Sequence, residues 1–413
     1  MDNLTHSLIG LVAGEVAARA LPARSSTLPA DTRRGILLCM GVVGSNLPDI
    51  DLLWSMSTGD QLGYLLEHRG YTHTVLGCLL LATLLYGGAW LWLRIRSLSA
   101  SAQDRLTLGI TACASVLLHL SMDALNVYGV HPFWPWNNRW FYGDAVFIIE
   151  PLYWLAAAPL LFVLRTTTAR VVLALILLVA GIAVLAVHRF GLLWWSAPLL
   201  AGLLVMLGRR CSARAAALTS ATLMLVIAAV FMTGRQVAAS RIDALAHQHF
   251  PGVVTLDKVL SPNPTNPFCW DVLLVQSGND SYVVRRGLLS IARPPLAASC
   301  SRLLAGRGTA PLTPVSAAES PEMLWLGEFA ATRSSLTSLV ANDCAARELM
   351  QFVRAPFATE VDGHWVIGDL RFDREAGVGM AELAIDPGRP RSCRYKVPWI
   401  PPRADLLDPA AGE

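Results

Sequence analysis

Long apolar stretches separated by short polar segments fill the first half of the chain. A helix that crosses the hydrocarbon core of a bilayer needs roughly 20 mostly apolar residues, or fewer where the bilayer thins. Leu4–Leu21 contains charged side chains, so it either spans the membrane or lies in the interface as an amphipathic helix. The other candidate spans are Gly35–Trp54, Thr74–Leu93, Leu106–Leu125, Val146–Leu164, Val171–Val187, Leu192–Leu207 and Ala215–Met232. The pattern predicts a mainly α protein with a polytopic transmembrane bundle of about eight helices in residues 1–234.

From about Arg235, Pro-rich turns and short alternating runs replace the long apolar stretches. Glu348–Val353 is compatible with a helix. The runs that alternate as strands do are Asp271–Gln276, Tyr282–Arg285, Trp365–Asp369 and Met380–Ile385. The pattern predicts a small soluble domain, β-rich or α+β, in residues 235–413.

Arginine residues are distributed unevenly between the two sides of the predicted bundle. With Leu4–Leu21 as the first span, the even-numbered loops hold only Arg69, Arg139 and Arg189. The odd-numbered loops hold Arg24, Arg33, Arg34, Arg94, Arg96, Arg105, Arg165, Arg170, Arg209, Arg210 and Arg214. Positive residues stay on the cytoplasmic side of an inner membrane. The even-numbered loops and residues 235–413 are therefore predicted to face the periplasm.

Cysteine usage gives a second argument for that orientation. The carboxy-terminal part holds an even number of cysteines: Cys269, Cys300, Cys344 and Cys393. Four cysteines permit two disulfides if this part faces an oxidising compartment.

Composition narrows the class of protein further. The chain is 54% hydrophobic and only 15% charged, whereas a soluble domain carries about 25% charged residues. The net charge of +3 is small and there is no strong basic patch, so no nucleic-acid partner is expected. The start, MDNLTHSLIG, lacks the positive region of a cleavable signal peptide.

Candidate chemistry comes from His and Asp side chains inside or beside the apolar stretches: His6, Asp49, Asp51, His68, His73, His119 and Asp123. Ionisable residues at membrane depth are costly and usually mark a functional site. His119 and Asp123 are four residues apart, which on a helix places them on one face about 6 Å apart. That spacing suits a metal ion held by a single helix, and it also suits a simple hydrogen bond between two buried groups.

The remaining candidates lie near the ends of predicted spans. His68 and His73 flank Arg69-Gly70-Tyr71-Thr72, in which Gly70 allows a tight turn and Thr72 is the expected N-cap of the next helix. In the predicted topology this loop and Asp49, Asp51 and Asp123 lie on the outer side of the membrane. Each piece alone fits surface histidines or solvated carboxylates, whereas their shared location predicts one metal site.

The ligand types indicate the metal and its chemistry. Histidine and carboxylate without cysteine suit zinc first, and also manganese or iron. Seven candidates exceed the needs of one tetrahedral site, so one or two ions are predicted, and paired ions are common in phosphoester hydrolysis. Asp49 or Asp51 is then the expected base or bridging carboxylate, and Arg69 the expected phosphate ligand or an interfacial anchor. The expected outer residues, which orient the metal ligands, are Asn126, His131 and Glu150.

Several of these motifs resemble the bacterial membrane-bound metal-dependent hydrolases of the domain-of-unknown-function 457 family, which includes YdjM. The matching pieces are Thr5-His6-Ser7, Leu47-Pro48-Asp49-Ile50-Asp51, His68-Arg69-Gly70-Tyr71-Thr72-His73, His119-x-x-x-Asp123, the stretch 126–144, Pro264-Thr265-Asn266-Pro267-Phe268-Cys269-Trp270 and Gly368-Asp369-Leu370-Arg371-Phe372. More remotely, the family is similar to zinc-dependent phospholipase C and P1-type nucleases, which are soluble and use more histidine ligands. That likeness implies His68 or His73, His119, Asp123 and one of Asp49 or Asp51 as ligands.

Taken together, the sequence favours a metal-dependent hydrolase of the inner membrane that cleaves a phosphoester with a metal-activated water. A lipid or lipid-linked substrate is expected because the site lies in the membrane. The alternative is a transporter or metal-handling protein in which the same cluster is a transit site, and a scaffold whose tail binds a partner is a third hypothesis. Inverted repeats would support a transporter, and the sequence contains none that we recognise.

Overall fold

The computed structural model describes residues 1–57, 59–187, 196–293, 297–300, 311–316, 320–373, 375–377, 379–386 and 393–407. The chain forms two compact units. The first is made of Met1–Ile50, Tyr71–Trp134 and Val146–Phe231, and the second of Asp51–Gly70, Pro135–Ala145 and Met232–Glu413. The predicted division after residue 234 follows the chain linearly, whereas these units are discontinuous.

Polar and aromatic contacts explain why two segments from the amino-terminal half belong to the second unit. In the first of them, the carboxylate of Asp60 accepts hydrogen bonds from Tyr395 at 2.8 Å and Arg394 at 3.0 Å. In the other, the indole N–H of Trp140 donates to the carbonyl of Gln351 at 2.9 Å.

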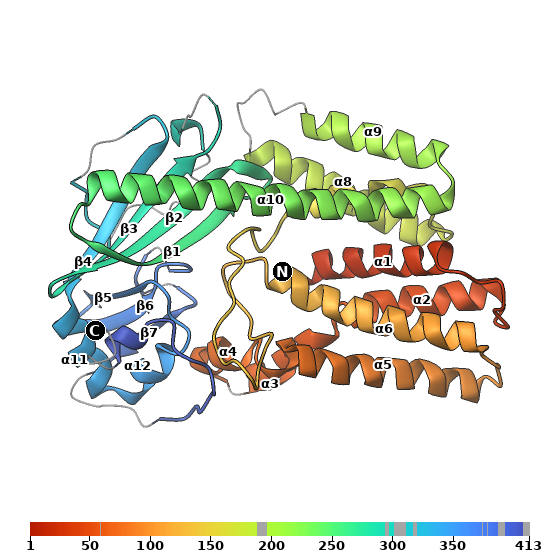
Figure 1. Cartoon of the computed structure of the whole chain (residues 1–413), viewed down its shortest axis with the longest axis horizontal. Coiled ribbons are helices and arrows are strands. Elements are labelled where there is room, and N and C mark those ends of the chain that lie inside the picture. The colour runs from red at the N-terminus through yellow and green to blue at the C-terminus, as the bar shows by residue number, and fades with distance from the viewer. Residues whose placement is uncertain are drawn as a thin grey trace. The chain divides into compact units, whose positions relative to one another are not determined.

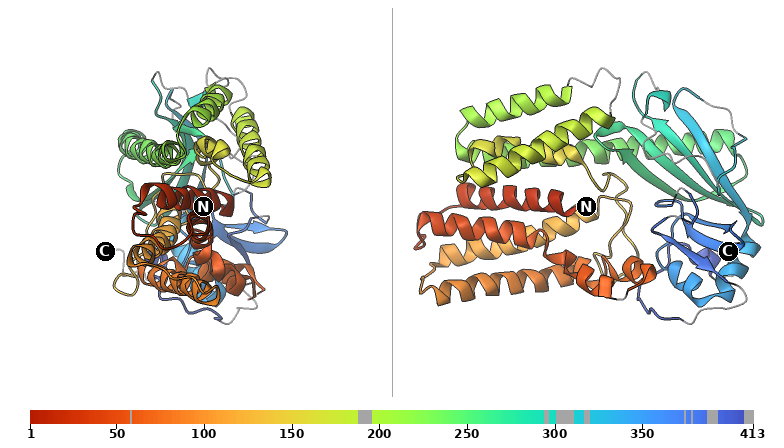
Figure 2. Two further views of the ribbon diagram at one scale, coloured as in Figure 1. Left: turned by 90° about the vertical axis from the view of Figure 1, so that its right-hand side faces the viewer. Right: turned by 180° about the vertical axis from the view of Figure 1, so that it is seen from behind.

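Four helices form the core of the first unit and pack side by side (Figures 1 and 2). They are α1 (Asn3–Ala20), α2 (Ala30–Gly44), α5 (Val75–Ile95) and α6 (Ala102–Asp123). Gly10 and Gly41 bring α1 and α2 into close approach, since a Cβ atom at either glycine would collide with the backbone of the facing helix. Small residues at helix interfaces are typical of membrane bundles. Between α2 and α5 the chain forms two short 3-10 helices, η1 (Leu47–Ile50) and η2 (Tyr71–His73), at one end of this core.

The first unit contains further helices among its described residues. These are α7 (Pro151–Ala156), η3 (Ala158–Phe162), α8 (Thr167–Val187), α9 (Ser196–Arg210) and the first part of α10 (Ala213–His249). Because α10 has 37 residues, it continues into the second unit.

Among the described residues, four helices are long and apolar enough to cross a membrane, and a bent pair of helices makes a fifth if it counts as one span. The four are Val75–Ile95, Ala102–Asp123, Thr167–Ala186 and Ala213–His249, and the pair is Ala30–Gly44 with Leu47–Ser57. This confirms the prediction of a helical membrane protein at the level of four or five candidate spans, rather than about eight.

The predicted span Gly35–Trp54 forms as the bent pair of helices, and three more predicted spans differ from the helices that form. Val146–Leu164 contains only the short helical segment Pro151–Phe162, because Pro151 is the first residue of α7 and Pro159 the second residue of η3, where a proline fits the start of a short helix and not the interior of a long one. Leu192–Leu207 corresponds to α9, which begins at Ser196, and residues 192–195 lie outside the described part. Leu4–Leu21 forms α1, which is not among the candidate spans and holds a buried Glu15.

In the part that the structure describes, the second unit contains two antiparallel sheets. The larger has the order β1-β2-β3-β4, and the smaller has the order β5-β6-β7. Their strands are β1 (Val254–Asn263), β2 (Asn266–Gly278), β3 (Ser281–Ser290), β4 (Met323–Thr332), β5 (Pro356–Val361), β6 (His364–Asp369) and β7 (Glu382–Ile385). The helices of this unit are α3 (Asp51–Ser57), α4 (Gln61–Glu67), α11 (Arg333–Asn342) and α12 (Cys344–Leu349). The four predicted strands correspond to β2, β3, β6 and β7, and the last two pair with each other in the smaller sheet. The predicted helix at Glu348–Val353 is largely wrong, because α12 ends at Leu349.

The core of the larger sheet lies against the carboxy-terminal part of α10. Ala238, Ile242 and Leu245 of this helix pack with Trp270 and Leu289 of the sheet, and all five side chains are buried. Apolar side chains spaced three to four residues apart on α10 therefore cover the apolar face of the sheet.

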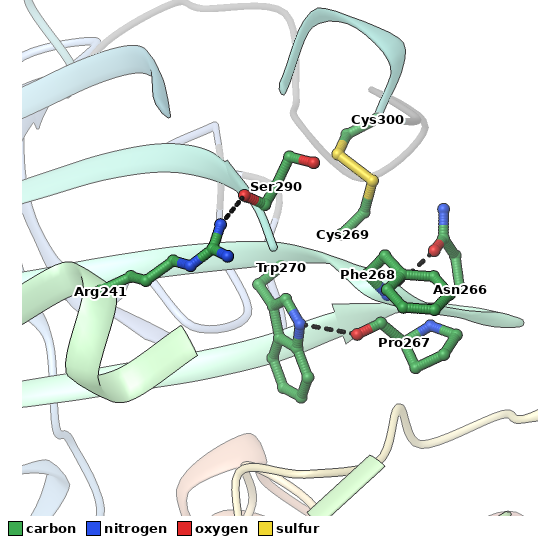
Figure 3. Close-up of a disulfide and its surroundings, with 8 residues drawn as sticks. All are labelled: Arg241, Asn266, Pro267, Phe268, Cys269, Trp270, Ser290 and Cys300. Atoms are coloured by element: carbon green, nitrogen blue, oxygen red, sulfur yellow. Dashed lines mark hydrogen bonds between the residues drawn. A yellow bond between two sulfur atoms is a disulfide. The ribbon is translucent and has the colours of Figure 1, made fainter. Parts of the chain in front are cut away.

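Two disulfides hold the second unit. They join Cys269 to Cys300 and Cys344 to Cys393. Figure 3 shows the first, at the start of β2, where the Trp270 indole donates to the carbonyl of Pro267 at 3.0 Å. The prediction that the four late cysteines can form two disulfides is confirmed.

Candidate metal centre

The last turn of α6 supplies two completely buried groups. His119 and Asp123 are four residues apart and face the same way, with His119 Nε2 3.5 Å from Asp123 Oδ2. The i,i+4 spacing that predicted a shared face is therefore confirmed. Because neither side chain reaches water, both need partners within the first unit.

His73 comes from η2, immediately before α5. Its Nε2 atom lies 3.0 Å from His119 Nε2 and 3.2 Å from Asp123 Oδ2. The N-cap of α5 is Thr74, whose hydroxyl accepts from Gly77 N. The expectation of Thr72 as the N-cap is wrong, because the Thr72 hydroxyl contacts His73 Nδ1 at 3.0 Å.

Asp49 reaches the same group from η1. Its Oδ1 atom lies 3.4 Å from His119 Nε2 and 3.5 Å from His73 Nε2. Its other oxygen, Oδ2, accepts a hydrogen bond of 2.9 Å from the side-chain amide of Asn3. A proline at 48 and a 3-10 turn thus end the apolar segment with one carboxylate directed at the histidines.

Four donor atoms, which we name the Asp49 cluster, converge in this way: Asp49 Oδ1, His73 Nε2, His119 Nε2 and Asp123 Oδ2. Five of the six separations between them are 3.0–3.5 Å. In a tetrahedral zinc site with bonds of about 2.0–2.1 Å, neighbouring ligand atoms lie about 3.3 Å apart. Two carboxylates that converge in a buried place also call for a cation. The residues therefore fit a divalent metal ion.

The second nitrogen of each histidine ring is already engaged. His119 Nδ1 lies 2.7 Å from the carbonyl oxygen of Ser45, so this nitrogen carries the proton and donates it. His73 Nδ1 contacts the Thr72 hydroxyl. The Ser45 carbonyl fixes the tautomer of His119, because a carbonyl oxygen can only accept, and both contacts leave Nε2 available as the ligand atom. Both Nε2 atoms are thereby aimed at the centre of the Asp49 cluster.

His6, on α1, contacts two members of the cluster. Its ring stacks on that of His119 with centroids 3.9 Å apart, and its Nε2 atom is 3.2 Å from Asp123 Oδ1. The α-amino group of Met1 contacts the same oxygen. His6 thus contacts the oxygen of Asp123 that is not one of the four donors. Its predicted role as a direct ligand stays a prediction.

The other predicted ligands and the predicted phosphate-binding residue lie in the second unit. His68 Nδ1 is 3.0 Å from Asp51 Oδ1, and the backbone N–H of Arg69 donates to Asp51 Oδ2 at 2.9 Å. Arg69 has a left-handed backbone with φ of 60° and a buried side chain. Within the first unit the cluster is complete without these three residues.

The three predicted outer residues are all buried. Asn126 accepts a hydrogen bond from Tyr128 N at 2.9 Å, and Glu150 caps α7 by accepting from Leu152 N at 3.1 Å. His131 is fully buried in the loop after α6. These contacts describe local structural roles, and the predicted role in orienting ligands stays a prediction.

Two groups in the site escaped the sequence reasoning. The Ser45 carbonyl is a backbone group at the end of α2, so no side-chain pattern could reveal it. Asn3 lies two residues before the Thr5-His6-Ser7 motif, and this position was the signal that the sequence offered for its contact with Asp49.

This fold and site define a helical membrane protein with a His and Asp cluster that can hold a metal ion. In agreement, residues 1–192 match the family described as YdjM inner membrane protein. The resemblance predicted from the motifs is confirmed for this region, and the match leaves residues 193–413 unassigned. The likeness to phospholipase C and P1-type nucleases is not among the matches and stays a prediction.

One relative among the curated proteins is the uncharacterized protein YfhP of Bacillus subtilis (strain 168), which is 25% identical over 140 residues. The aligned stretch covers 34% of this chain and 39% of that protein, so the chain spans well under half of the relative's length. No solved structure matches the chain.

Proposed function

We propose that this protein is a metal-dependent hydrolase of the inner membrane that cleaves a phosphoester in a lipid or lipid-linked substrate. The observation that carries the proposal is the Asp49 cluster, whose donor separations of 3.0–3.5 Å fit one tetrahedral ion at the end of a candidate span. Zinc is the metal that these ligand types suit first, and manganese and iron are the other candidates.

A bound divalent ion supplies Lewis-acid activation of water and of a phosphoryl oxygen. The chain's own residues do the rest. Asp49 is the donor that solvent reaches, since its side chain is 9% exposed and those of the other three donors are 0% exposed. Because a catalytic site needs an open position beside the ion, this favours Asp49 as the carboxylate that would yield its place to water and then accept a proton from it. Asp51 stays a predicted base and Arg69 a predicted phosphate ligand, the latter because its guanidinium offers a fork of donors.

The reaction proposed is ordinary hydrolysis. The oxygen of water attacks phosphorus, the bond from phosphorus to the ester oxygen breaks, and the leaving alcohol takes a proton. The products are one alcohol and one phosphate monoester or free phosphate, depending on the ester. No redox step or second substrate is needed.

Orientation completes the proposal. The two disulfides support a second unit in an oxidising compartment, which in a bacterium is the periplasm. The uneven arginine distribution supports the same side for the site. Counting α1, α9 and the short Pro151–Phe162 segment as spans gives a bundle of about eight. An even number of spans puts the start of the chain and the second unit on the same side of the membrane, which here is the periplasm.

The test is hydrolysis of defined phospholipid vesicles by the purified, metal-loaded protein, followed by phosphorus NMR of the released products. Asp123→Asn should abolish product formation. Asp362→Asn is the matched control, because Asp362 lies in the exposed β5–β6 turn at φ of 50°, where asparagine is tolerated. Metal binding without product from any phosphoester would sink the hydrolase proposal, and metal uptake into sealed vesicles would favour the transporter.

A further inference from the structure

A cavity of about 690 Å³ lies between α2 and α5, within the first unit. Each helix lines it with residues four positions apart, which form a stripe along one helix face. The stripe on α2 is Gly35, Cys39 and Val43, and it continues to Leu47 of η1, while the stripe on α5 is Leu84, Gly88 and Trp92. We name this cavity the α2–α5 groove.

Small residues keep the α2–α5 groove open. A Cβ atom added at Gly35 or at Gly88 would have no atom within 4 Å. Cys39 lies between them in the α2 stripe and is exposed. The groove is therefore not filled by side chains of the described protein, although both helices otherwise pack against α6.

The chemistry of the lining selects the occupant. Among the lining residues only Thr32 carries a hydroxyl, and the others are apolar or glycine. Both walls belong to candidate spans. An apolar groove at membrane depth favours hydrocarbon over water. The occupant that surrounds such helices is the acyl chain of a membrane lipid.

The length of the groove agrees with that occupant. Thr32 and Val43, eleven residues apart on α2, are separated by about 16 Å along the helix axis at about 1.5 Å per residue. One leaflet contributes about 15 Å, half of a hydrocarbon core about 30 Å thick. A single acyl chain of ordinary length therefore extends from one end of the groove to the other.

One end of the groove leads to the Asp49 cluster. Leu47 is the last lining residue on the α2 side, and Asp49 follows it in the same 3-10 helix. On the other wall the lining begins at Leu84, nine residues into α5, so the α2 side alone brings the groove next to the cluster. We infer that the α2–α5 groove binds one acyl chain of a membrane phospholipid and so directs its phosphoester to the cluster. The inference of an acyl-chain site depends only on the cavity and its lining. The inference that this site positions a substrate rests on the proposed function.

Neighbouring glycines on α5 offer a matched pair of variants. Gly88 lines the groove, whereas Gly87 does not, and neither has an atom within 4 Å of its added Cβ. Gly88→Trp should fill the groove, and Gly87→Trp should place the same indole elsewhere on α5. Lipid tails are as apolar as the lining, so packing and not the hydrophobic effect decides occupancy in the bilayer. We therefore expect the indole of Gly88→Trp to exclude the acyl chain by occupying its space.

The experiment uses the full chain in vesicles of phosphatidylethanolamine and phosphatidylglycerol that contain a phosphatidylglycerol with a diazirine on one acyl chain. After illumination, mass spectrometry maps the adducts. Wild type and Gly87→Trp should carry adducts on the α2 and α5 peptides, and Gly88→Trp should lose about nine-tenths of them, which corresponds to about 1.4 kcal/mol.

Two results would overturn the acyl-chain site. The first is equal labelling of α2 and α5 in the two tryptophan variants. The second is crosslinking of Cys39 to Cys39 of a second copy with no lipid adducts, which would make the groove an interface between copies. Labelling needs no turnover, so the two proposals fail separately: groove-specific adducts without lipid hydrolysis would retain the site and reject the hydrolase, and hydrolysis without such adducts would do the reverse.

Discussion

Replacing Asn3 with alanine removes the amide that donates to Asp49 Oδ2 at 2.9 Å. That amide holds the carboxylate so that Oδ1 faces His73 and His119. Loss of an outer hydrogen bond of this kind typically weakens metal binding by about 10–100-fold. A hydrogen bond to a charged group contributes about 1.5–3 kcal/mol. Because Asn3 is exposed and water can replace its amide, we expect the lower end, about tenfold or about 1.4 kcal/mol.

The assay is a chelator competition that measures the zinc dissociation constant of the purified full-length protein. Asn342→Ala is the matched control, because Asn342 is an exposed asparagine of α11 in the second unit with one long hydrogen bond of 3.4 Å to Ser338. It should leave the dissociation constant unchanged. Equal zinc affinities in Asn3→Ala and Asn342→Ala would refute the reasoning that Asn3 orients a metal-binding Asp49.

Three further predictions concern the second unit. Cys269→Ser with Cys300→Ser opens a loop with a sequence separation of 31, so chemical denaturation should show a free energy of unfolding that is lower by about 4 kcal/mol. An unchanged denaturation midpoint would contradict the argument that the disulfide restricts the unfolded chain. Arg354→Ala should lower the free energy of unfolding by about 3–5 kcal/mol, because it leaves the buried carboxylate of Asp144 without its two hydrogen bonds of 2.9 and 3.0 Å from Arg354. Arg354→Lys should recover part of that free energy. Burial, with nearby acidic groups, raises the pKa of Asp373 to about 7. The folded state therefore keeps this proton while the unfolded state releases it near pH 4, so the contribution of Asp373 to stability falls as pH rises from about 4 through about 7. Thermal unfolding of Asp373→Asn should show a smaller decrease over that range than the wild type, and identical pH profiles would count against the assignment.

The fold was predictable where a single property of the sequence, such as hydropathy or strand alternation, determines the element. Long, mostly apolar runs were sufficient for α5, α6, α8 and α10, because about twenty mostly apolar residues have few alternatives to a span. The prediction for residues 146–164 failed because hydropathy alone ignores the two prolines in the first turns of the short helices there. Strand alternation found β2, β3, β6 and β7.

The site was predictable in its residue types and only partly in its geometry. Spacing within one helix fixed the relation of His119 to Asp123. The choice between His68 and His73, and between Asp49 and Asp51, depends on short turns whose direction the sequence pattern does not encode. The structure brings His73 and Asp49 to His119, and it pairs His68 with Asp51. The Ser45 carbonyl, which orients His119, is a product of the backbone path alone.

Metal analysis of the purified protein tests the central claim most directly. The wild type, loaded with zinc and passed through a desalting column, should retain zinc in proportion to protein. The double variant His119→Ala with Asp123→Ala removes two of the four donors of the Asp49 cluster, and it should lose that zinc while remaining folded by circular dichroism. Zinc content equal to that of the wild type in the folded double variant would contradict the account.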